Sequence, residues 1–318
     1  MNLKLHAAIL ALLALGCATE SPEASDPEPD PEPAPPEPEA PAPPVESATA
    51  PAPPKEKVLA HFLTWFKAGK GMDGRVTNIT RVAEKFSDLV VQPGEEVSFN
   101  KLVGPRTEEN GFKNAPTYFM GEILEGIGGG TCQVSSTLYA GLLHAGVQIT
   151  DRRPHSRPSS YVEPGLDATV NYPAECQTDK PDPRVCYDFK FKNAYDFPLR
   201  IQMIPGPEPT EEVDGIYKRR LDITVLGTGD VPKITTEWKA WESSPFVKRI
   251  RRNPYWKNDR TRVKQPGQNG LTGARVITST YPDGRVETTK IRSVYQPVPE
   301  VWEVGLEWKD PEAKEATE

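Results

Sequence analysis

The sequence is poor in the residues that build metal and redox centres. It contains four cysteines and four histidines in 318 residues, and the histidines lack the short spacings of metal ligands. No glycine-rich loop of the nucleotide-binding type stands between a strand pattern and a helix pattern. We therefore expect neither a metal ion nor another cofactor.

The N-terminal apolar stretch, residues 7–15, is too short to span a membrane. It follows Lys4 and precedes Cys17, as in an export signal. The residues before Cys17 resemble the lipobox of bacterial lipoproteins, with Ala14 where leucine is commoner. The resemblance implies a lipid on Cys17; the alternative is a plain secreted signal with an incidental cysteine. Because no acidic residue directly follows Cys17, we expect a lipid anchor on the periplasmic side, in the outer membrane.

Residues 18–54 contain no lysine or arginine and cannot build a core. They hold 14 of the 35 prolines and nine acidic residues. Such a segment stays extended in water, so we expect a tether between the anchor and the folded domains. Because the tether has nine acidic and no basic residues while the whole chain has a net charge of −7, the acidic isoelectric point comes from the tether and says nothing about the ligand of residues 55–318.

Two further cysteines, Cys176 and Cys186, lie ten residues apart in a loop rich in proline and aspartate. In an exported protein this spacing predicts a local disulfide. A metal-binding pair is the weaker alternative, because no other cysteine and no histidine lies beside them.

Cys132 follows three glycines and stands at the start of a helical pattern that ends at Gly146. Apolar residues recur on one face of this helix: Val134, Leu138, Leu142 and Ala145. Thr131 is the predicted N-cap, which places Cys132 in the first turn, where backbone N–H groups and the helix dipole favour a thiolate. His155 and Asp167 follow, in the order of a thiol acyl-transfer site. A small buried cysteine is the alternative.

Other residues near these three are candidates for binding substrate. Backbone N–H groups around the glycine run form a candidate oxyanion hole: Gly129, Gly130, Thr131 and Gln133. Arg106 and Arg152 are candidate ligands of a substrate carboxylate, or structural residues. Ser156 is a candidate for placing His155. His61 and His144 are further candidate bases, although His144 lies too far along the predicted helix.

The remaining pattern predicts an α+β fold with the cysteine-bearing helix packed on an antiparallel sheet. A second helix is predicted over residues 78–89, with Thr77 as its cap. Residues 58–66 are ambiguous between helix and strand. Short strands are predicted around the following residues: 161–162, 168–172, 187–192 and 199–203.

Residues 55–205 resemble the VanW domain, in motifs that stand in the family's order. The main pieces are Arg75 with Asn78-Ile79, Pro93-Gly94-Glu95-x-x-Ser98-Phe99-Asn100, Gly104-x-Arg106-Thr107, Gly128-Gly129-Gly130-x-Cys132-Gln133-Val134-Ser135, Arg152 with His155-Ser156, and Tyr161-x-x-x-Gly165-x-Asp167. The resemblance implies an exported bacterial protein linked to peptidoglycan, in a family named from a vancomycin-resistance cluster. Some members are reported as L,D-transpeptidases that use the cysteine of this motif. It therefore implies Cys132 as nucleophile and His155, by position, as base.

The stretch from Gly130 to Val147 is also similar to the core of transglutaminase-like thiol enzymes, in which histidine and aspartate follow the cysteine helix. This similarity implies a transglutaminase/papain-like arrangement with Asp167 orienting His155. A turn residue after Gly165 is the alternative for Asp167.

Residues 235–306 resemble the G-five module, a small all-β domain. Five glycines carry the resemblance: Gly267, Gly270, Gly273, Gly284 and Gly305. It implies binding of cell-wall sugars. The predicted organisation is a signal peptide, a tether, a VanW-like domain, a linker, a G-five-like module and a polar tail: 1–17, 18–54, 55–205, 206–234, 235–306 and 307–318.

Residues 248–264 hold eight basic residues against one acidic residue. An exported protein seldom meets nucleic acid, so we expect none as a partner. The open alternatives are a solvated strand face and a surface for anionic wall or outer-membrane groups.

Two functions agree with the sequence. One is a cysteine transpeptidase or carboxypeptidase that acts on peptidoglycan stem peptides. The other is a non-catalytic tether that binds peptidoglycan and leaves Cys132 as inert packing.

Overall fold

The computed structural model describes residues 55–119, 122–178, 180–206, 212–213 and 215–311. The predicted signal peptide, the lipidation site at Cys17 and the tether lie outside these residues and stay predictions. Pro53–Glu318 form one unit. Within the described ranges, no helix combines the length and the apolar character needed to cross a membrane.

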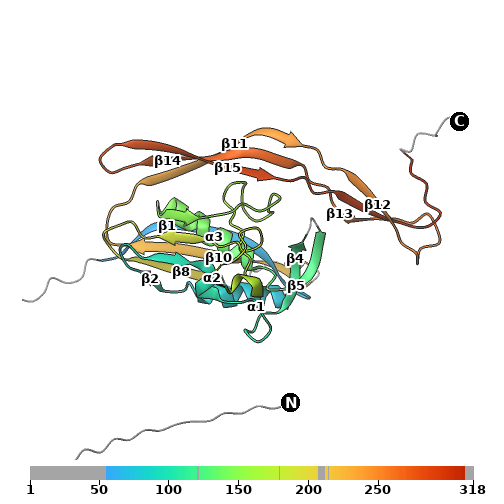
Figure 1. The fold of residues 1–318 in the computed structure, drawn as a ribbon, viewed down its shortest axis with the longest axis horizontal. Coiled ribbons are helices and arrows are strands. Elements are labelled where there is room, and N and C mark those ends of the chain that lie inside the picture. The colour runs from blue at the N-terminus through green and yellow to red at the C-terminus, as the bar shows by residue number, and fades with distance from the viewer. Residues whose placement is uncertain (1–54, 120–121, 179, 207–211, 214, 312–318) are drawn as a thin grey trace, which may run out of the picture. The chain divides into compact units, whose positions relative to one another are not determined.

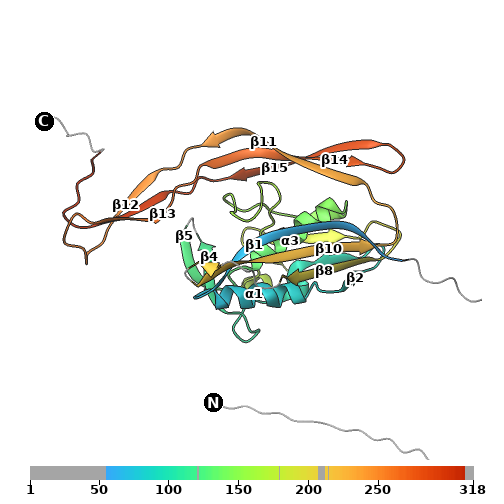
Figure 2. The ribbon, with the colours of Figure 1, turned by 180° about the vertical axis from the view of Figure 1, so that it is seen from behind.

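The main sheet of the first part has the strand order β1–β10–β8–β2, with β9 paired to β10. Its members are β1 (Lys57–Gly69), β2 (Leu89–Val91), β8 (Leu199–Pro205), β9 (Glu212–Val213) and β10 (Ile216–Gly227). All neighbours run antiparallel, and their order can be followed in Figure 2. Residues 58–66, which were ambiguous between helix and strand, belong to strand β1. Alternate residues of β1 are buried, as expected for a strand: Thr64, Phe66 and Ala68.

Helix α3 (Thr131–His144) packs on β1 and β10 of this sheet (Figure 1). The prediction of Thr131 as its cap is wrong: Gly130 holds that position at φ 107°, and the Thr131 hydroxyl donates to the Gly128 carbonyl over 2.7 Å. The left-handed backbone conformation at this position favours glycine over threonine. Gly146 follows the helix at φ 69°. The predicted apolar face is fully buried: Val134, Leu138, Leu142 and Ala145.

Helix α1 (Asp73–Glu84) packs against α3 and the same sheet. The prediction of residues 78–89 places it too late, so that Thr77 lies inside the helix. The last predicted residue, Leu89, instead begins β2, because pairing with β8 satisfies its backbone there. The apolar face itself agrees with the prediction, since its central residues are fully buried: Ile79 and Val82.

Smaller elements surround the start of α3. One sheet has the order β3–β7–β6 and consists of β3 (Glu96–Ser98), β6 (Gln148–Asp151) and β7 (Lys190–Lys192). The remaining elements are α2 (Phe99–Val103) and an antiparallel hairpin of β4 (Asn114–Phe119) and β5 (Glu122–Ile127). The hairpin ends directly before the glycine run.

The segment between β6 and β7 is mostly loop. The strands predicted around residues 161–162 and 168–172 do not form, although Asn171 makes an isolated antiparallel bridge with Tyr187. A 3-10 turn (Ala174–Cys176) is the one helical element among the described residues of this segment. Part of its backbone bonds to α3, as when the Ser135 hydroxyl donates to the Ala168 carbonyl over 2.6 Å. This contact buries the segment and accounts for its strand-like apolar pattern.

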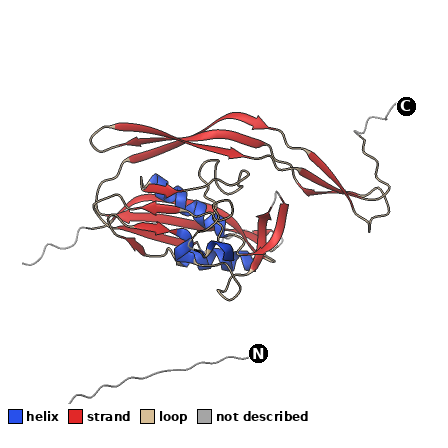
Figure 3. Ribbon diagram, viewed as in Figure 1, coloured by secondary structure: helices blue, strands red, loops and turns tan. Residues whose placement is uncertain are grey.

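The C-terminal part is built from two three-stranded sheets. The first has the order β11–β14–β15: β11 (Lys233–Ser244), β14 (Gly270–Thr280) and β15 (Val286–Tyr295). The second has the order β12–β16–β13: β12 (Lys248–Arg252), β13 (Thr261–Gln265) and β16 (Glu300–Val304). The predicted hairpin turn joins β14 to β15, with Gly284 at φ 85°. Figure 3 shows strands and loops but no helix in this described part of the chain.

The coarse fold prediction is confirmed. The described chain is rich in strands, its cysteine-bearing helix packs on an antiparallel sheet, and an all-β region follows.

Candidate active site

Cys132 is the second residue of α3, at the N-terminal end of the helix. Its Sγ lies 3.5 Å from the Val170 carbonyl oxygen, and the thiol lies close enough to His155 for the two groups to shift each other's pKa. Among the described cysteines, Cys132 is the one that forms no disulfide. The structure joins Cys176 to Cys186 in a disulfide with a Cα–Cα distance of 5.5 Å, the pair expected from their spacing.

His155 connects the thiol to a carboxylate. Its Nδ1 lies 2.8 Å from Oδ2 of Asp167, so Nε2 is the nitrogen left to face Cys132. The hydroxyl of Tyr161 lies 3.4 Å from the same Nε2. The structure therefore brings Cys132, His155 and Asp167 together: His155 is hydrogen-bonded to Asp167 and interacts electrostatically with Cys132.

Asp167 is completely buried, and its carboxylate accepts four hydrogen bonds. The Oδ2 atom accepts from the backbone N–H and Nδ1 of His155, over 2.6 and 2.8 Å. The Oδ1 atom accepts from Arg152 over 2.8 Å and from the Tyr295 hydroxyl over 2.5 Å. Burial alone would raise the pKa of Asp167, but the bonds from His155 and the charge of Arg152 lower it to about 2. Asp167 is therefore an ionised carboxylate at neutral pH.

The electrostatics of the site favour an ion pair between Cys132 and His155. Burial opposes the charge on His155, but its hydrogen bonds to Asp167 and to Cys132 raise the pKa of the imidazole to about 9. Burial likewise opposes a thiolate, but His155 and, more weakly, the charge of Arg106 lower the pKa of Cys132. At neutral pH the arrangement supports a thiolate beside an imidazolium.

Arg106 contributes positive charge near Cys132. Its guanidinium donates to the Gly104 carbonyl and to the Asn100 side chain, both over 2.7 Å. It lies over the rings of Phe99 and Tyr172, at 5.6 and 5.8 Å. Burial lowers the pKa of Arg106 to about 10, against the raising effect of the Cys132 charge. Arg106 therefore remains a candidate ligand for an anionic group of the substrate.

Arg152 bonds to the protein itself rather than facing an open space. Its guanidinium donates twice to Asp167, to the backbone carbonyl and to Oδ1, and once to the Ser293 hydroxyl over 3.0 Å. Its side chain is only 6% exposed. Of the two alternatives left open for Arg152, these contacts favour the structural one, because Asp167 already occupies the guanidinium.

The glycines before Cys132 pack closely against other parts of the protein rather than against an open space for a substrate. A Cβ on Gly129 would lie 2.6 Å from the Ala115 carbonyl oxygen, and one on Gly130 would lie 2.9 Å from Ile79. Gln133 is buried and faces away from the thiol. Its amide donates to Thr64 and to the Trp65 carbonyl, and it accepts from Arg75 over 2.6 Å.

Two backbone N–H groups of the predicted oxyanion hole already have partners: Thr131 donates to the Gly128 carbonyl over 3.1 Å, and Gln133 to the Gly130 carbonyl over 3.0 Å. Since the first N–H groups of a helix have no partner inside the helix, the backbone N–H of Cys132 remains the candidate oxyanion donor.

The other residues predicted to assist catalysis have partners outside the candidate active site. The Ser156 carbonyl accepts from the Gln296 N–H over 2.6 Å, and Ser156 is exposed. His61 pairs with Asp222 on the exposed main sheet, and the ring of His144 bonds to a carbonyl of its own helix. Neither His61 nor His144 belongs to the candidate active site.

Three contributing residues were not predicted as site residues. Burial raises the pKa of Tyr161, so its hydroxyl stays neutral beside His155. The Ser136 hydroxyl donates to the Cys132 carbonyl over 2.7 Å and accepts from the Ala168 N–H over 3.0 Å. Tyr161 stands in a motif shared with VanW domains, which was a usable signal. Nothing in the sequence points to Tyr295.

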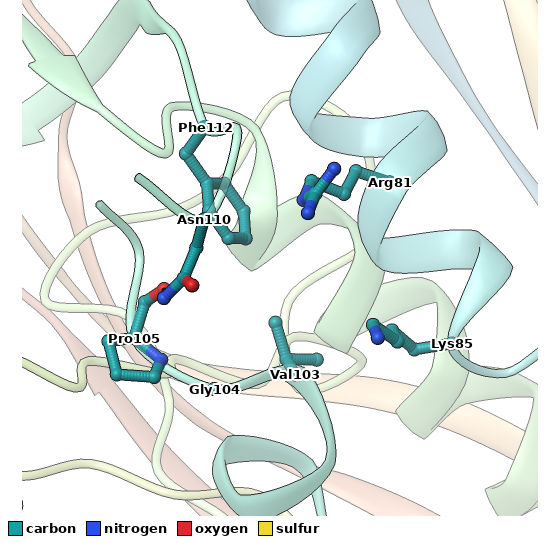
Figure 4. Close-up of a pocket in the computed structure, with 7 residues that line it drawn as sticks. All are labelled: Arg81, Lys85, Val103, Gly104, Pro105, Asn110 and Phe112. Atoms are coloured by element: carbon teal, nitrogen blue, oxygen red, sulfur yellow. The ribbon is translucent and has the colours of Figure 1, made fainter. Parts of the chain in front are cut away.

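A separate pocket lies between α1 and the loop after α2 (Figure 4). Its lining includes two basic residues of one helical face, Arg81 and Lys85, and the ring of Phe112. It contains none of the three connected residues of the candidate active site. Within the described residues, no group of three or more potential ligands could hold a metal ion.

The comparisons with known proteins identify both parts of the chain. Residues 74–210 match the family described as VanW like protein, and residues 235–307 match the G5 domain. The chain carries a VanW-like domain followed by a G5 domain.

Two curated relatives share the VanW-like region. The chain is 40% identical over 144 residues to "Uncharacterized protein YoaR" of Bacillus subtilis (strain 168), covering 45% of this chain and 43% of the relative. It is 31% identical over 104 residues to "Vancomycin B-type resistance protein VanW" of Enterococcus faecalis (strain ATCC 700802 / V583), covering 31% and 38%. The chain thus spans less than half the length of either relative.

Among solved structures, the chain is similar to "IgA1 Protease G5 domain structure". The match covers 24% of this chain and 95% of that chain, with 22% identity and a TM-score of 0.17.

Proposed function

We propose that the protein is a cysteine acyl-transferase that acts on the stem peptides of peptidoglycan. The observation that carries this proposal is the connected chain Cys132–His155–Asp167 at the start of α3. A thiolate paired with an imidazolium, and oriented by a buried carboxylate, is the arrangement that thiol acyl transfer requires.

In the first step the Cys132 thiolate attacks the carbonyl carbon of a peptide bond to a terminal D-amino acid. The C–N bond breaks, and the His155 imidazolium gives its proton to the leaving amine, which leaves a thioester on Cys132. In the second step an amine or water attacks the thioester and gives a proton to His155, and the thiolate leaves. An amine acceptor makes a crosslink, as in an L,D-transpeptidase, and water makes a carboxypeptidase.

The start of α3 offers support for the transition state. The N–H of Cys132 and the positive end of the helix dipole would face the developing oxyanion. Arg106 would bind a carboxylate of the stem peptide. The cysteine at a helix start, followed by histidine and aspartate, is the basis for a transglutaminase/papain-like arrangement.

The relatives support the substrate class and the location. The E. faecalis relative is called a vancomycin resistance protein, which agrees with a role at the cell wall. Through its G5 domain the chain would also hold wall glycan. We place the protein in the bacterial cell envelope, anchored by lipid at Cys17 on the periplasmic side of the outer membrane, with residues 18–54 as the tether.

The test uses residues 55–318 with muropeptides that carry intact stem peptides, and mass spectrometry of the products. Dimers, or loss of a terminal D-amino acid, are expected with the wild type and absent with Cys132→Ala. His155→Gln should lose activity, whereas the matched change His144→Gln, outside the site, should keep it. Binding without turnover across a range of stems would instead identify a non-catalytic wall-binding tether.

A further inference from the structure

Two residues of strand β15, in the G5 domain, reach the candidate active site. Tyr295 is 2% exposed, and its hydroxyl donates to Oδ1 of Asp167 over 2.5 Å. The same hydroxyl accepts from the Gly165 N–H over 2.6 Å. Ser293, two positions earlier, accepts from Arg152 over 3.0 Å. The domain therefore supplies one of the two groups that hold Oδ1 of Asp167, Tyr295, and contacts the other, Arg152.

The loop that carries Asp167 is held by the neighbouring strand β14 as well. Arg275 is 1% exposed, donates to the Pro164 carbonyl over 2.5 and 3.1 Å, and pairs with Glu163 over 3.0 Å. Gly165 has φ 82°, and a Cβ there would lie 2.8 Å from Arg275. The G5 domain thus fixes the backbone just before Asp167 and also one of its carboxylate oxygens.

The two oxygens of the Asp167 carboxylate bond to different partners, so the contacts from strand β15 affect how the carboxylate is oriented. His155 occupies Oδ2 with two hydrogen bonds, and Tyr295 and Arg152 occupy Oδ1. Donors on both oxygens prevent the carboxylate from turning about its side-chain bonds. A carboxylate held in one orientation keeps Oδ2 directed at the imidazole.

We propose that Tyr295 is a positioning residue of the active site, and that the G5 domain completes the site of the VanW-like domain. The proposal rests on the proposed acyl transfer for its catalytic meaning. The geometric part stands by itself: the alignment of Asp167 with His155 depends on strand β15. The G5 domain then has a second role besides holding glycan.

The experiment measures the titration of His155 by NMR in the full chain, for the wild type and three variants. Tyr295→Phe keeps the ring but removes the hydroxyl, and Ser293→Ala removes the partner of Arg152. Tyr281→Phe is the matched control, because its hydroxyl bonds to Glu287 on the same domain, away from the site.

In Tyr295→Phe, the pKa of His155 should fall by about 0.5 or more, a threefold change in the ratio of imidazolium to imidazole. The reason is that a carboxylate held at Oδ1 by Arg152 alone is less firmly directed at the imidazole and stabilises the imidazolium less. Ser293→Ala should change the pKa in the same direction by a smaller amount, and Tyr281→Phe should leave it unchanged.

An unchanged or raised pKa of His155 in both site variants, with folding confirmed by thermal melting, overturns the proposal. If Tyr295→Phe does not fold, the result with Ser293→Ala decides. Muropeptide turnover is measured in parallel. A lowered pKa of His155 together with an inactive wild type would retain the positioning role and reject the proposed function.

Discussion

Replacing Asp167 by asparagine tests the electrostatic basis of the candidate site most directly. The carboxylate is the partner that, with Cys132, raises the pKa of His155 to about 9 from an ordinary value of 6.5. In Asp167→Asn, burial becomes the larger influence, so the pKa should fall to 6.5 or below. At pH 8 the imidazolium fraction should therefore drop from about 90% to about 3% or less.

The same change should also destabilise the fold. The pKa of Asp167 is about 2 in the folded protein and 3.8 for the free group. Because the pKa of Asp167 is lower in the folded protein, the ionised carboxylate stabilises the fold. This stabilisation is present above about pH 4 and is lost as the pH falls through about 2. The difference corresponds to about 2 kcal/mol at pH 7, which Asp167→Asn should remove from the free energy of unfolding.

The raised pKa of His155 has the opposite dependence. Its stabilising contribution is present below about pH 6.5 and is lost as the pH rises through about 9. The two groups together place the best stability of the site between about pH 4 and 6.5.

The assay is an NMR titration of His155, with iodoacetamide alkylation of Cys132 and urea unfolding on the same samples. Asp222→Asn is the matched control, because Asp222 also bonds to a histidine, His61, but on the exposed sheet. A pKa of His155 that stays near 9 in folded Asp167→Asn would refute the assignment of Asp167 as its partner.

Three other changes give further tests. Replacing Cys176 and Cys186 together by serine should lower the unfolding free energy by about 2.5 kcal/mol, the value for a closed loop of about ten residues, measured by urea titration. Gly129→Ala should destabilise by about 1–3 kcal/mol in a thermal melt, because its Cβ would overlap backbone carbonyls of β4. Arg106→Gln should slow alkylation of Cys132 at pH 6 by about threefold, because Arg106 lowers the thiol pKa less than His155 does.

The sequence allowed prediction wherever the physical cause is local. The helix after Cys132 follows from apolar spacing, and its end follows from Gly146, which has the left-handed conformation that glycine tolerates. The hairpin turn at Gly284 follows from its own short motif. His155 and Asp167 were selected from their order after Cys132 and from family resemblance. The structure brings both to the thiol.

The sequence alone does not show whether a polar side chain near the candidate site bonds to substrate or to the protein. Gln133 stands beside the nucleophile in the sequence, but its partners Arg75 and Thr64 lie 58 and 69 positions away. A helix residue next to Cys132 points about 100° away from it, and no local pattern shows what that direction meets. The same limit applies to Gly129, since the carbonyls it approaches belong to β4.

The two arginines show why residue type alone could not assign the substrate ligand. Arg106 and Arg152 have the same chemistry, yet Arg152 is occupied by Asp167 because Asp167 is buried and needs donors on both oxygens. One of those donors, Tyr295, comes from 128 positions further along the chain and from a different domain. A buried carboxylate accepts hydrogen bonds from any element that packs over it. The candidate site can therefore extend beyond the VanW-like domain. An activity assay on that domain alone would therefore measure a site that lacks one of its four hydrogen bonds to Asp167.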